Sequence, residues 1–297
     1  MIDNALRGAL VVGADGKIGG ALVADLKRAG RAVRGTVLDP RDADEDRDVL
    51  DLAGPPESWA CPSAEVAYLC AAVTRLEDCR RDPERAFRVN VEGTCGLARR
   101  LVGAGAFVVF LSSNEVLDGH APLAGADDPV CPATEYGRQK AEAERRLLAL
   151  GGSVAVVRLT KVLGSGFALF AQWAAAMKAG RAVHPFSDRA MAPVPLAFVV
   201  AALRGIGERR LAGIWQVSGE RDVSYAEAAR LGARALGLDE DLVQPVAAGP
   251  AGPGEPLSRL HTTLRSDRTC EALGLRVPAV DETIRTAFVD PAALDRL

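Results

Sequence analysis

The sequence predicts an α/β protein, with a doubly wound parallel sheet, helices on both faces and a smaller C-terminal lobe. Apolar strand-like segments alternate with amphipathic helix-like segments through the first half of the chain, which is the pattern of βαβ units. Three evenly spaced glycines join the first strand to the first helix. The 297 residues are 48% hydrophobic and only 5% aromatic, so they can fill a large, mainly aliphatic core.

The three glycines lie in residues 10–20, where an apolar strand runs into a helix. Gly13 would let the chain turn sharply off the strand, Gly16 would let the backbone approach a pyrophosphate, and Gly19 would let the helix pack close to the sheet. The free N–H groups and the positive end of the helix dipole would face the diphosphate. This segment predicts a Rossmann-type dinucleotide-binding fold.

The second strand is expected over residues 32–38, and its end affects the choice between NAD and NADP. An acidic residue there accepts hydrogen bonds from the adenosine ribose, whereas a basic residue favours a 2′-phosphate. Both types are present, as Asp39 and Arg41, so the sequence leaves the preference between NAD and NADP open. A third short strand, over 47–52, ends in Asp51 and Leu52.

The next strand, over residues 64–72, ends in three small residues, Cys70, Ala71 and Ala72. Small side chains at the carboxyl end of a strand let a cofactor lie against the backbone. A long helix is expected from 83 to 103, with Asn90 inside an otherwise apolar face. An amide in such a place usually has a hydrogen-bonding role.

The strand over residues 106–111 runs directly into Ser113, and a Gly/Pro-rich loop then leads to a helix that carries Tyr136 and Lys140. The last two are four residues apart and therefore share a helix face. An ammonium beside a phenol favours the phenolate and lowers the phenol pKa, while a serine hydroxyl can hold a carbonyl oxygen against the phenol. The pattern predicts Ser113, Tyr136 and Lys140 as catalytic residues.

The second half of the chain loses the strict alternation. Helices are expected over residues 167–179, 195–205 and 224–236, the last capped by Ser224, with a strand over 213–218 and a Gly/Pro loop over 249–256. We expect a dinucleotide-binding domain over 1–163 and a mainly substrate-binding lobe over 164–297, some segments of which return to the sheet.

Composition excludes several classes of function. The net charge of −3 is spread without long blocks of one sign, which argues against nucleic-acid or anionic-membrane partners. Six cysteines without a C-x-x-C pair indicate reduced thiols, and three scattered histidines indicate no metal site. Without a signal pattern or a long apolar run, the sequence predicts a cytoplasmic protein.

In their order along the chain, these motifs resemble the extended short-chain dehydrogenase/reductase family over nearly the whole length. Residues 112–119, 261–264 and, loosely, 185–194 are most similar to dTDP-4-dehydrorhamnose reductases. The resemblance implies hydride transfer at C4 of a nucleotide sugar, with NAD or NADP as cofactor, Tyr136 as proton donor and Lys140 on the nicotinamide ribose. A homodimer is one option for assembly. The expected cofactor-binding residues are Gly13, Asp15, Gly16, Lys17, Ile18, Gly19, Asp39, Asp51, Leu52, Cys70, Ala71, Ala72, Asn90, Tyr136 and Lys140.

Three alternatives depend on the two residues after Ser113 or on whether turnover occurs. The related 4,6-dehydratases need an Asp-Glu pair for water elimination, and this chain has Asn114 and Glu115 instead. An amide cannot act as an acid, so dehydration is disfavoured. An NAD-dependent sugar-nucleotide epimerase needs no such pair and remains open, as does a non-catalytic dinucleotide-binding regulator or subunit.

Overall fold

The computed structural model describes residues 8–55, 63–249 and 261–296. Its main element is a seven-stranded sheet in the order β10-β6-β5-β4-β1-β2-β3. Strand β1 pairs in parallel with β2 and β4, and the β2–β3 and β4–β5 pairs are parallel as well. The predicted Rossmann-type sheet is therefore confirmed. The strands are Ala9–Val12 (β1), Val33–Val37 (β2), Arg47–Val49 (β3), Val66–Leu69 (β4), Phe107–Ser113 (β5), Val154–Leu159 (β6) and Gly213–Val217 (β10).

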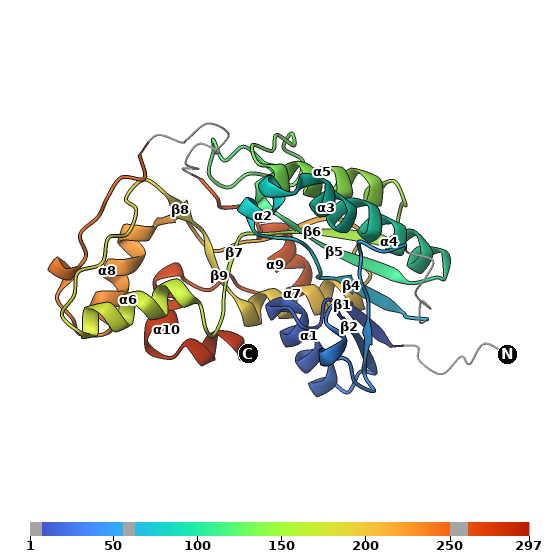
Figure 1. Ribbon diagram of the computed structural model, residues 1–297, viewed down its shortest axis with the longest axis horizontal. Helices are drawn as coiled ribbons and strands as arrows, with labels where there is room; N and C mark the ends of the chain where they lie inside the picture. Colours follow the sequence, from blue (N-terminus) through green and yellow to red (C-terminus); the bar gives the residue numbers. More distant parts are fainter. Residues whose placement is uncertain (1–7, 56–62, 250–260, 297) are drawn as a thin grey trace. The chain divides into compact units, whose positions relative to one another are not determined.

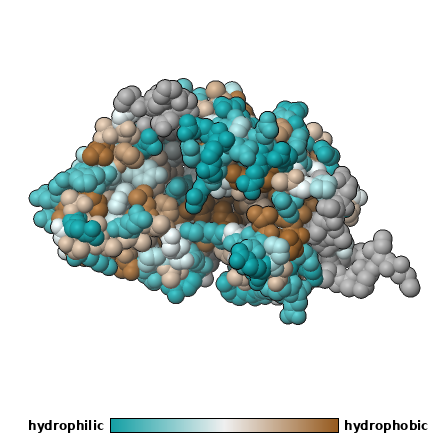
Figure 2. All heavy atoms as spheres, viewed as in Figure 1, coloured by the Kyte–Doolittle hydropathy of each residue, from teal (hydrophilic) through white to brown (hydrophobic). Residues whose placement is uncertain are grey.

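Helices cover both faces of this sheet, with α3, α4 and α5 on one side and α1 and α7 on the other (Figure 1). An ion pair of 2.8 Å between Asp25 and Arg204 joins α1 to α7. The outward sides of α1 and of the α3–α5 layer are mostly hydrophilic (Figure 2), as expected of amphipathic helices. The helices are Lys17–Arg28 (α1), Leu76–Arg81 (α2), Pro83–Phe87 (α3), Thr94–Gly103 (α4), Glu135–Leu148 (α5) and Leu196–Glu208 (α7).

The core of the sheet is aliphatic, as the composition predicts. Leu, Val and Ala side chains fill the space between β1, β4, β5, β6 and the helices α4 and α5, and Phe110 is the aromatic residue among the buried members of this cluster. Close packing follows from the near-continuous apolar runs of parallel strands buried on both faces.

The chain divides into two compact units. The first comprises residues 1–116, 130–158 and 200–215, and the second comprises 117–129, 159–199 and 216–297. The second unit has two small sheets, β7 with β9 and β8 with β11, and a core in which the Phe170 ring stacks on Trp173 and Phe288. Its elements are Lys161–Leu163 (β7), Ala168–Lys178 (α6), Ala190–Met191 (β8), Pro193–Pro195 (β9), Val223–Ser224 (β11), Tyr225–Ala235 (α8), Asp267–Leu273 (α9) and Val280–Val289 (α10).

Several elements differ from the expectation. The helix predicted over 83–103 contains a π-helical turn, Arg88–Gly93, and α2, α9 and α10 have no counterpart in the sequence-based prediction. The Ser224 cap is confirmed, because its hydroxyl accepts a hydrogen bond of 3.0 Å from the Glu227 N–H. The predicted 249–256 loop lies outside the described residues from 250 onward. Short 3₁₀ helices cover Pro40–Asp42, Asn114–Val116, Glu240–Leu242 and Pro291–Asp295.

Five cysteines fall within the described residues, and all five are free thiols, while Cys61 lies outside that part. No helix in the described ranges is both long and apolar enough to cross a membrane.

Candidate active site

The glycine segment forms one wall of a cavity of about 470 Å³ within the first unit. Gly13 adopts φ +84°, and a Cβ there would lie 2.8 Å from the Ala71 backbone nitrogen. A Cβ on Gly19 would lie 2.0 Å from the Gly13 carbonyl oxygen, so any larger residue would push α1 away from the loop. The turn and the close approach that the spacing predicts are both present.

Helix α1 starts at this cavity without a capping side chain. Gly16 is its N-cap residue, and the first turn carries no acidic residue. The first N–H groups of a helix lack partners within the helix, so here they are available to an anion in the cavity. The Gly13 N–H is already used, because it donates to the Thr36 hydroxyl at 3.1 Å.

Most of the predicted cofactor-binding residues line this cavity: Gly13, Asp15, Gly16, Lys17, Ile18, Gly19, Asp51, Leu52, Cys70, Ala71 and Ala72. Asp39, Asn90, Tyr136 and Lys140 are not among its lining residues. Sequence reasoning missed eight others, which are Thr36, Val37, Leu38, Leu50, Val73, Thr74, Arg85 and Val89. The six residues next to the ends of predicted strands could have been predicted from that position. Arg85 and Val89 could not, because they reach the cavity only through the way their helical segments pack beside it.

Asp39 and Arg41 form a pair with each other. The Arg41 guanidinium donates to both Asp39 carboxylate oxygens, and the pair is exposed, with 88% of the Arg41 side chain accessible. The hydrogen bond from Arg41 holds the pKa of Asp39 below its usual value. At the end of β2 the cavity is lined by the apolar Val37 and Leu38, and the Asp15 carboxylate, which accepts from the Leu38 N–H at 3.4 Å, lies beside them.

Asn90 is fully buried in the π-helical turn. Its amide oxygen accepts from the Val73 N–H at 2.8 Å, and its amide nitrogen donates to the Val73 carbonyl at 3.0 Å and to the Gln139 side chain at 2.8 Å. The predicted hydrogen-bonding role is thus confirmed. Because Val73 lines the cavity, Asn90 connects that wall to helix α5.

Ser113, Tyr136 and Lys140 come together as the spacing predicts. The Ser113 hydroxyl acts on the Tyr136 phenol and favours a lower phenol pKa, and it donates to the Asn114 side-chain oxygen at 3.3 Å. The Lys140 ammonium lies 5.8 Å from the centre of the Tyr136 ring and donates to the Leu111 carbonyl at 2.8 Å. Tyr136 is 9% exposed and Lys140 is 3% exposed, so the site is largely shielded from water. Lys140 also acts electrostatically on the Cys70 thiol of the cavity wall.

The pKa of Tyr136 differs from the expectation. Burial raises it well above its usual value, Glu115 and Cys79 raise it further, and the Ser113 hydroxyl opposes them. The expectation that Lys140 brings the phenol pKa down toward neutrality is therefore wrong for the free protein, because desolvation dominates. A protonated phenol at neutral pH is the form that a proton donor requires.

Glu115, which stands where a dehydratase needs its base, has structural partners. It accepts a hydrogen bond of 3.1 Å from Thr134, the residue that caps α5, and its N–H donates to the Ser113 hydroxyl at 3.2 Å. These contacts hold the loop after β5 against the start of α5.

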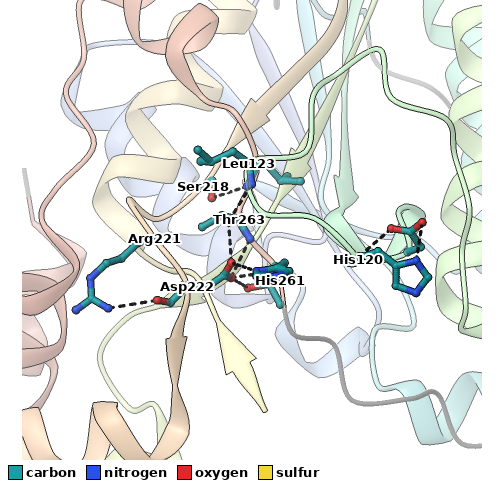
Figure 3. Close-up of polar contacts among 10 residues, drawn as sticks. His120, Leu123, Ser218, Arg221, Asp222, His261 and Thr263 are labelled. Atoms are coloured by element: carbon teal, nitrogen blue, oxygen red, sulfur yellow. Dashed lines mark hydrogen bonds and ion pairs between the residues drawn. The ribbon is translucent and has the colours of Figure 1, made fainter. Parts of the chain in front are cut away.

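In the second unit, Asp222 gathers the segment 261–264 that resembles the reductases (Figure 3). Its carboxylate accepts from the Thr262 N–H at 2.7 Å, from the Thr263 N–H at 3.0 Å and from both threonine hydroxyls at 2.8 Å, and His261 Nδ1 lies 3.3 Å away. The Asp222 side chain is 16% exposed. These hydrogen bonds to the Asp222 carboxylate therefore fix the position of residues 261–263.

We expect Asp222→Ala to lower the free energy of unfolding by roughly 2–4 kcal/mol, because several donors would lose a charged, mostly buried acceptor. Urea unfolding measures the loss, and hydrogen exchange should show faster exchange at the Thr262 and Thr263 amides. Asp281→Ala is the control: its side chain is 62% exposed and pairs with Arg221, so it should cost at most about 1 kcal/mol. Equal costs for the two variants would contradict the assigned role.

In the described part of the chain, no group of three or more His, Cys, Asp or Glu side chains is arranged to hold a metal ion. A larger cavity of about 690 Å³ in the first unit shares only Leu52 with the predicted site residues and is lined by Arg88, Arg99, Arg100 and Arg146 among others. The predicted chemistry is not located there.

Comparisons with known proteins indicate the family and the fold of this chain. A family model described as the RmlD substrate binding domain matches residues 7–289. The methionine adenosyltransferase 2 subunit beta of Xenopus laevis is 28% identical over 305 residues, covering 96% of this chain and 89% of that protein. The dTDP-4-dehydrorhamnose reductase of Mycolicibacterium smegmatis is 28% identical over 217 residues, covering 71% and 65%.

Among solved structures, MoeE5 in complex with UDP-glucose and NAD is similar with a TM-score of 0.80 and 24% identity, covering 97% of this chain and 98% of that one. This likeness confirms the fold. Since the family model spans almost the whole sequence, the chain belongs to the RmlD substrate binding domain family.

Proposed function

We propose that the protein is an NAD(P)-dependent reductase of a nucleotide-linked 4-keto sugar. The observation that carries the proposal is the buried Tyr136 phenol, whose ring centre lies 5.8 Å from the Lys140 ammonium and whose pKa is raised by burial, so that it holds a proton to donate. Family membership and the similarity to a dTDP-4-dehydrorhamnose reductase support the same reaction class.

The cavity beside the glycine segment fits a dinucleotide. Gly16 lines it without a side chain, and the start of α1 offers uncapped N–H groups to a diphosphate. MoeE5, the structural relative solved in complex with UDP-glucose and NAD, supports this cofactor class. When bound, the reduced nicotinamide supplies a hydride to the carbonyl carbon.

The residues of this chain supply the proton. As the carbonyl carbon is reduced, Tyr136 donates its phenolic proton to the carbonyl oxygen, which becomes a hydroxyl. Ser113 donates a hydrogen bond to the same oxygen. The Lys140 ammonium stabilises the phenolate that remains until it takes a proton from solvent.

A second candidate is a regulatory subunit, because the Xenopus laevis relative over 96% of this chain is a subunit of methionine adenosyltransferase. Such a protein would bind the dinucleotide without using the three residues. The chain has all three residues, and the Lys140 ammonium lies 5.8 Å from the centre of the Tyr136 ring, which favours the reductase.

The direct test is a screen of dTDP- and UDP-linked 4-keto sugars with NADPH and with NADH, in which absorbance of the reduced nicotinamide is followed. We expect at least one sugar to be reduced, with a clear preference for one of the two cofactors. Dinucleotide binding without oxidation for any sugar would overturn the reductase and favour the subunit.

A further inference from the structure

Ser112, Glu144 and Arg158 form a buried charge network in the first unit, one helical turn along α5 from Lys140. Glu144 on α5 and Arg158 on β6 make an ion pair of 2.8 Å, with side chains 3% and 1% exposed. Ser112 on β5, 4% exposed, donates its hydroxyl to Glu144 Oε1 at 2.5 Å. Arg158 Nε also lies 3.1 Å from Glu144 Oε1. Burying two charged groups costs desolvation free energy, which is offset only if they pair with each other or stabilise a neighbouring group.

Glu144 stands one helical turn beyond Lys140, which itself stands one turn beyond Tyr136. The spacing of four residues places all three on one face of α5. Lys140 is buried, and its ammonium donates to the Leu111 carbonyl and lies 4.5 Å from the centre of the Phe110 ring. The carboxylate is held by Arg158 and Ser112, so it acts on the ammonium through space and does not draw it away from Leu111.

We propose that Glu144 is a positioning residue for the proton-transfer site: held by Arg158 and Ser112, its carboxylate keeps the buried Lys140 amine in the ammonium form. The proposal rests on the function proposed above, in which that ammonium stabilises the Tyr136 phenolate. Glu144 itself touches neither substrate nor phenol in this scheme and acts through Lys140.

Among the groups that face Lys140, Glu144 is the anion that stabilises the ammonium near pH 7. They are Tyr136 and Glu144 on its own helix, Cys70 at the end of β4, Cys79 on α2, Cys95 on α4 and, beyond Glu144, Arg158 on β6. Burial raises the pKa of Cys70 to about 12 and that of Cys95 to about 11, and it also raises the pKa values of Cys79 and Tyr136. All four are therefore neutral near pH 7.

Burial and the Glu144 carboxylate shift the pKa of Lys140 in opposite directions. Burial lowers its pKa to about 8, and Glu144 is the largest influence that raises it. Since a lysine is charged below its pKa, the ammonium is present at neutral pH with a margin of about one unit. Without the carboxylate the pKa would fall toward neutrality or below, and the charge would be lost as the pH rises through that lower value.

The test measures the titration of Lys140 directly, by NMR of protein labelled with ¹³C at the lysine side chains. The chain has five lysines, Lys17, Lys27, Lys140, Lys161 and Lys178, and Lys140→Met identifies the signal. In the wild type we expect a midpoint near 8. In Glu144→Gln the midpoint should move to lower pH by roughly half to one unit.

The sign of the shift separates positioning from simple stabilisation. A variant that merely loosens the core would admit water to Lys140 and move its pKa upward, toward the ordinary value of about 10.4. The matched control is Asp25→Asn, which removes the carboxylate of the α1–α7 ion pair on the other side of the sheet, and it should leave the Lys140 midpoint unchanged.

An unchanged or raised midpoint in folded Glu144→Gln protein would overturn the proposal. If that variant does not fold, the double variant Glu144→Gln/Arg158→Met removes both buried charges and leaves neither ion unpaired. Its midpoint should still fall, but by less than in Glu144→Gln, because Glu144 is the largest influence that raises the Lys140 pKa while loss of the guanidinium acts in the opposite sense. An unchanged Lys140 midpoint in the double variant would also overturn the proposal.

This readout needs no substrate, so it succeeds or fails independently of the reductase assignment. If the reductase is also correct, turnover in Glu144→Gln should decline at lower pH than in the wild type and recover on acidification, while cofactor affinity measured at that lower pH stays near the wild-type value. A normal turnover profile alongside a shifted Lys140 midpoint would instead remove the link between the network and catalysis.

Discussion

Replacing Tyr136 with phenylalanine should remove most of the turnover with a 4-keto sugar nucleotide, by about a hundred- to ten-thousand-fold. The phenylalanine ring fills nearly the same buried space but carries no proton to donate. Cofactor affinity should change little, because Tyr136 is not among the residues that line the glycine-loop cavity. Initial rates from nicotinamide absorbance, together with fluorescence titration of NADPH and NADH, measure the two effects separately.

Two further variants calibrate this result. Ser113→Ala should be milder, since it removes one hydrogen bond to the carbonyl oxygen and leaves the proton donor in place. Tyr225→Phe, at a tyrosine of the second unit, removes a phenol outside the predicted triad and should leave turnover near the wild-type level. A Tyr136→Phe protein that turns over at the wild-type rate would show that the triad is not used, and the regulatory-subunit proposal would then be preferred.

Introducing valine at Gly16 should abolish measurable binding of NADH and NADPH. Gly16 lines the cavity at the start of α1, and it has φ −76°, a backbone conformation that valine can adopt. A Cβ there meets only the Gly13 carbonyl oxygen, at 3.4 Å, so the free protein can accommodate it. The added side chain would occupy space that the pyrophosphate needs and would keep it from the helix N–H groups.

Gly103→Val is the matched control for this prediction. Gly103 ends α4, and a Cβ on it would have no neighbour within 4 Å. It should bind the dinucleotide as the wild type does, and thermal unfolding should show that both variants are folded. Gly13 and Gly19 are poorer choices, since side chains there would clash with backbone and confuse misfolding with lost affinity. Wild-type affinity in Gly16→Val would contradict the assignment of the cavity.

The features that the sequence predicted correctly depend on short-range patterns. The strand–glycine–helix segment at 10–20 determines its own geometry, because φ at Gly13 and the contact at Gly19 exclude larger residues. The pairing of Tyr136 with Lys140 results from the pitch of a helix. The sequence predicts a hydrogen-bonding role for Asn90, because an amide on an apolar face is costly to bury without partners.

Features that depend on burial or on distant segments needed the structure. The direction of the Tyr136 pKa shift depends on how deeply the phenol is buried, and no local pattern contains that depth. The sequence leaves Asp39 and Arg41 open as ribose contacts, and only the structure shows that they pair with each other and do not line the cavity. The sequence predicts one continuous helix over 83–103, and only the structure shows the π-helical turn Arg88–Gly93 within it.

By itself, then, the sequence determined the sheet and the glycine loop, and it predicted the three residues of the proposed proton-transfer site from their spacing and from the ends of the predicted strands. Tertiary structure alone decided the environment of that site. Ser112, Glu144 and Arg158 come from β5, α5 and β6, and only the packing of α5 on the sheet brings them together behind Lys140. The reason is physical: the charge state of a buried group depends on the surrounding dielectric and on charges that reach it through space.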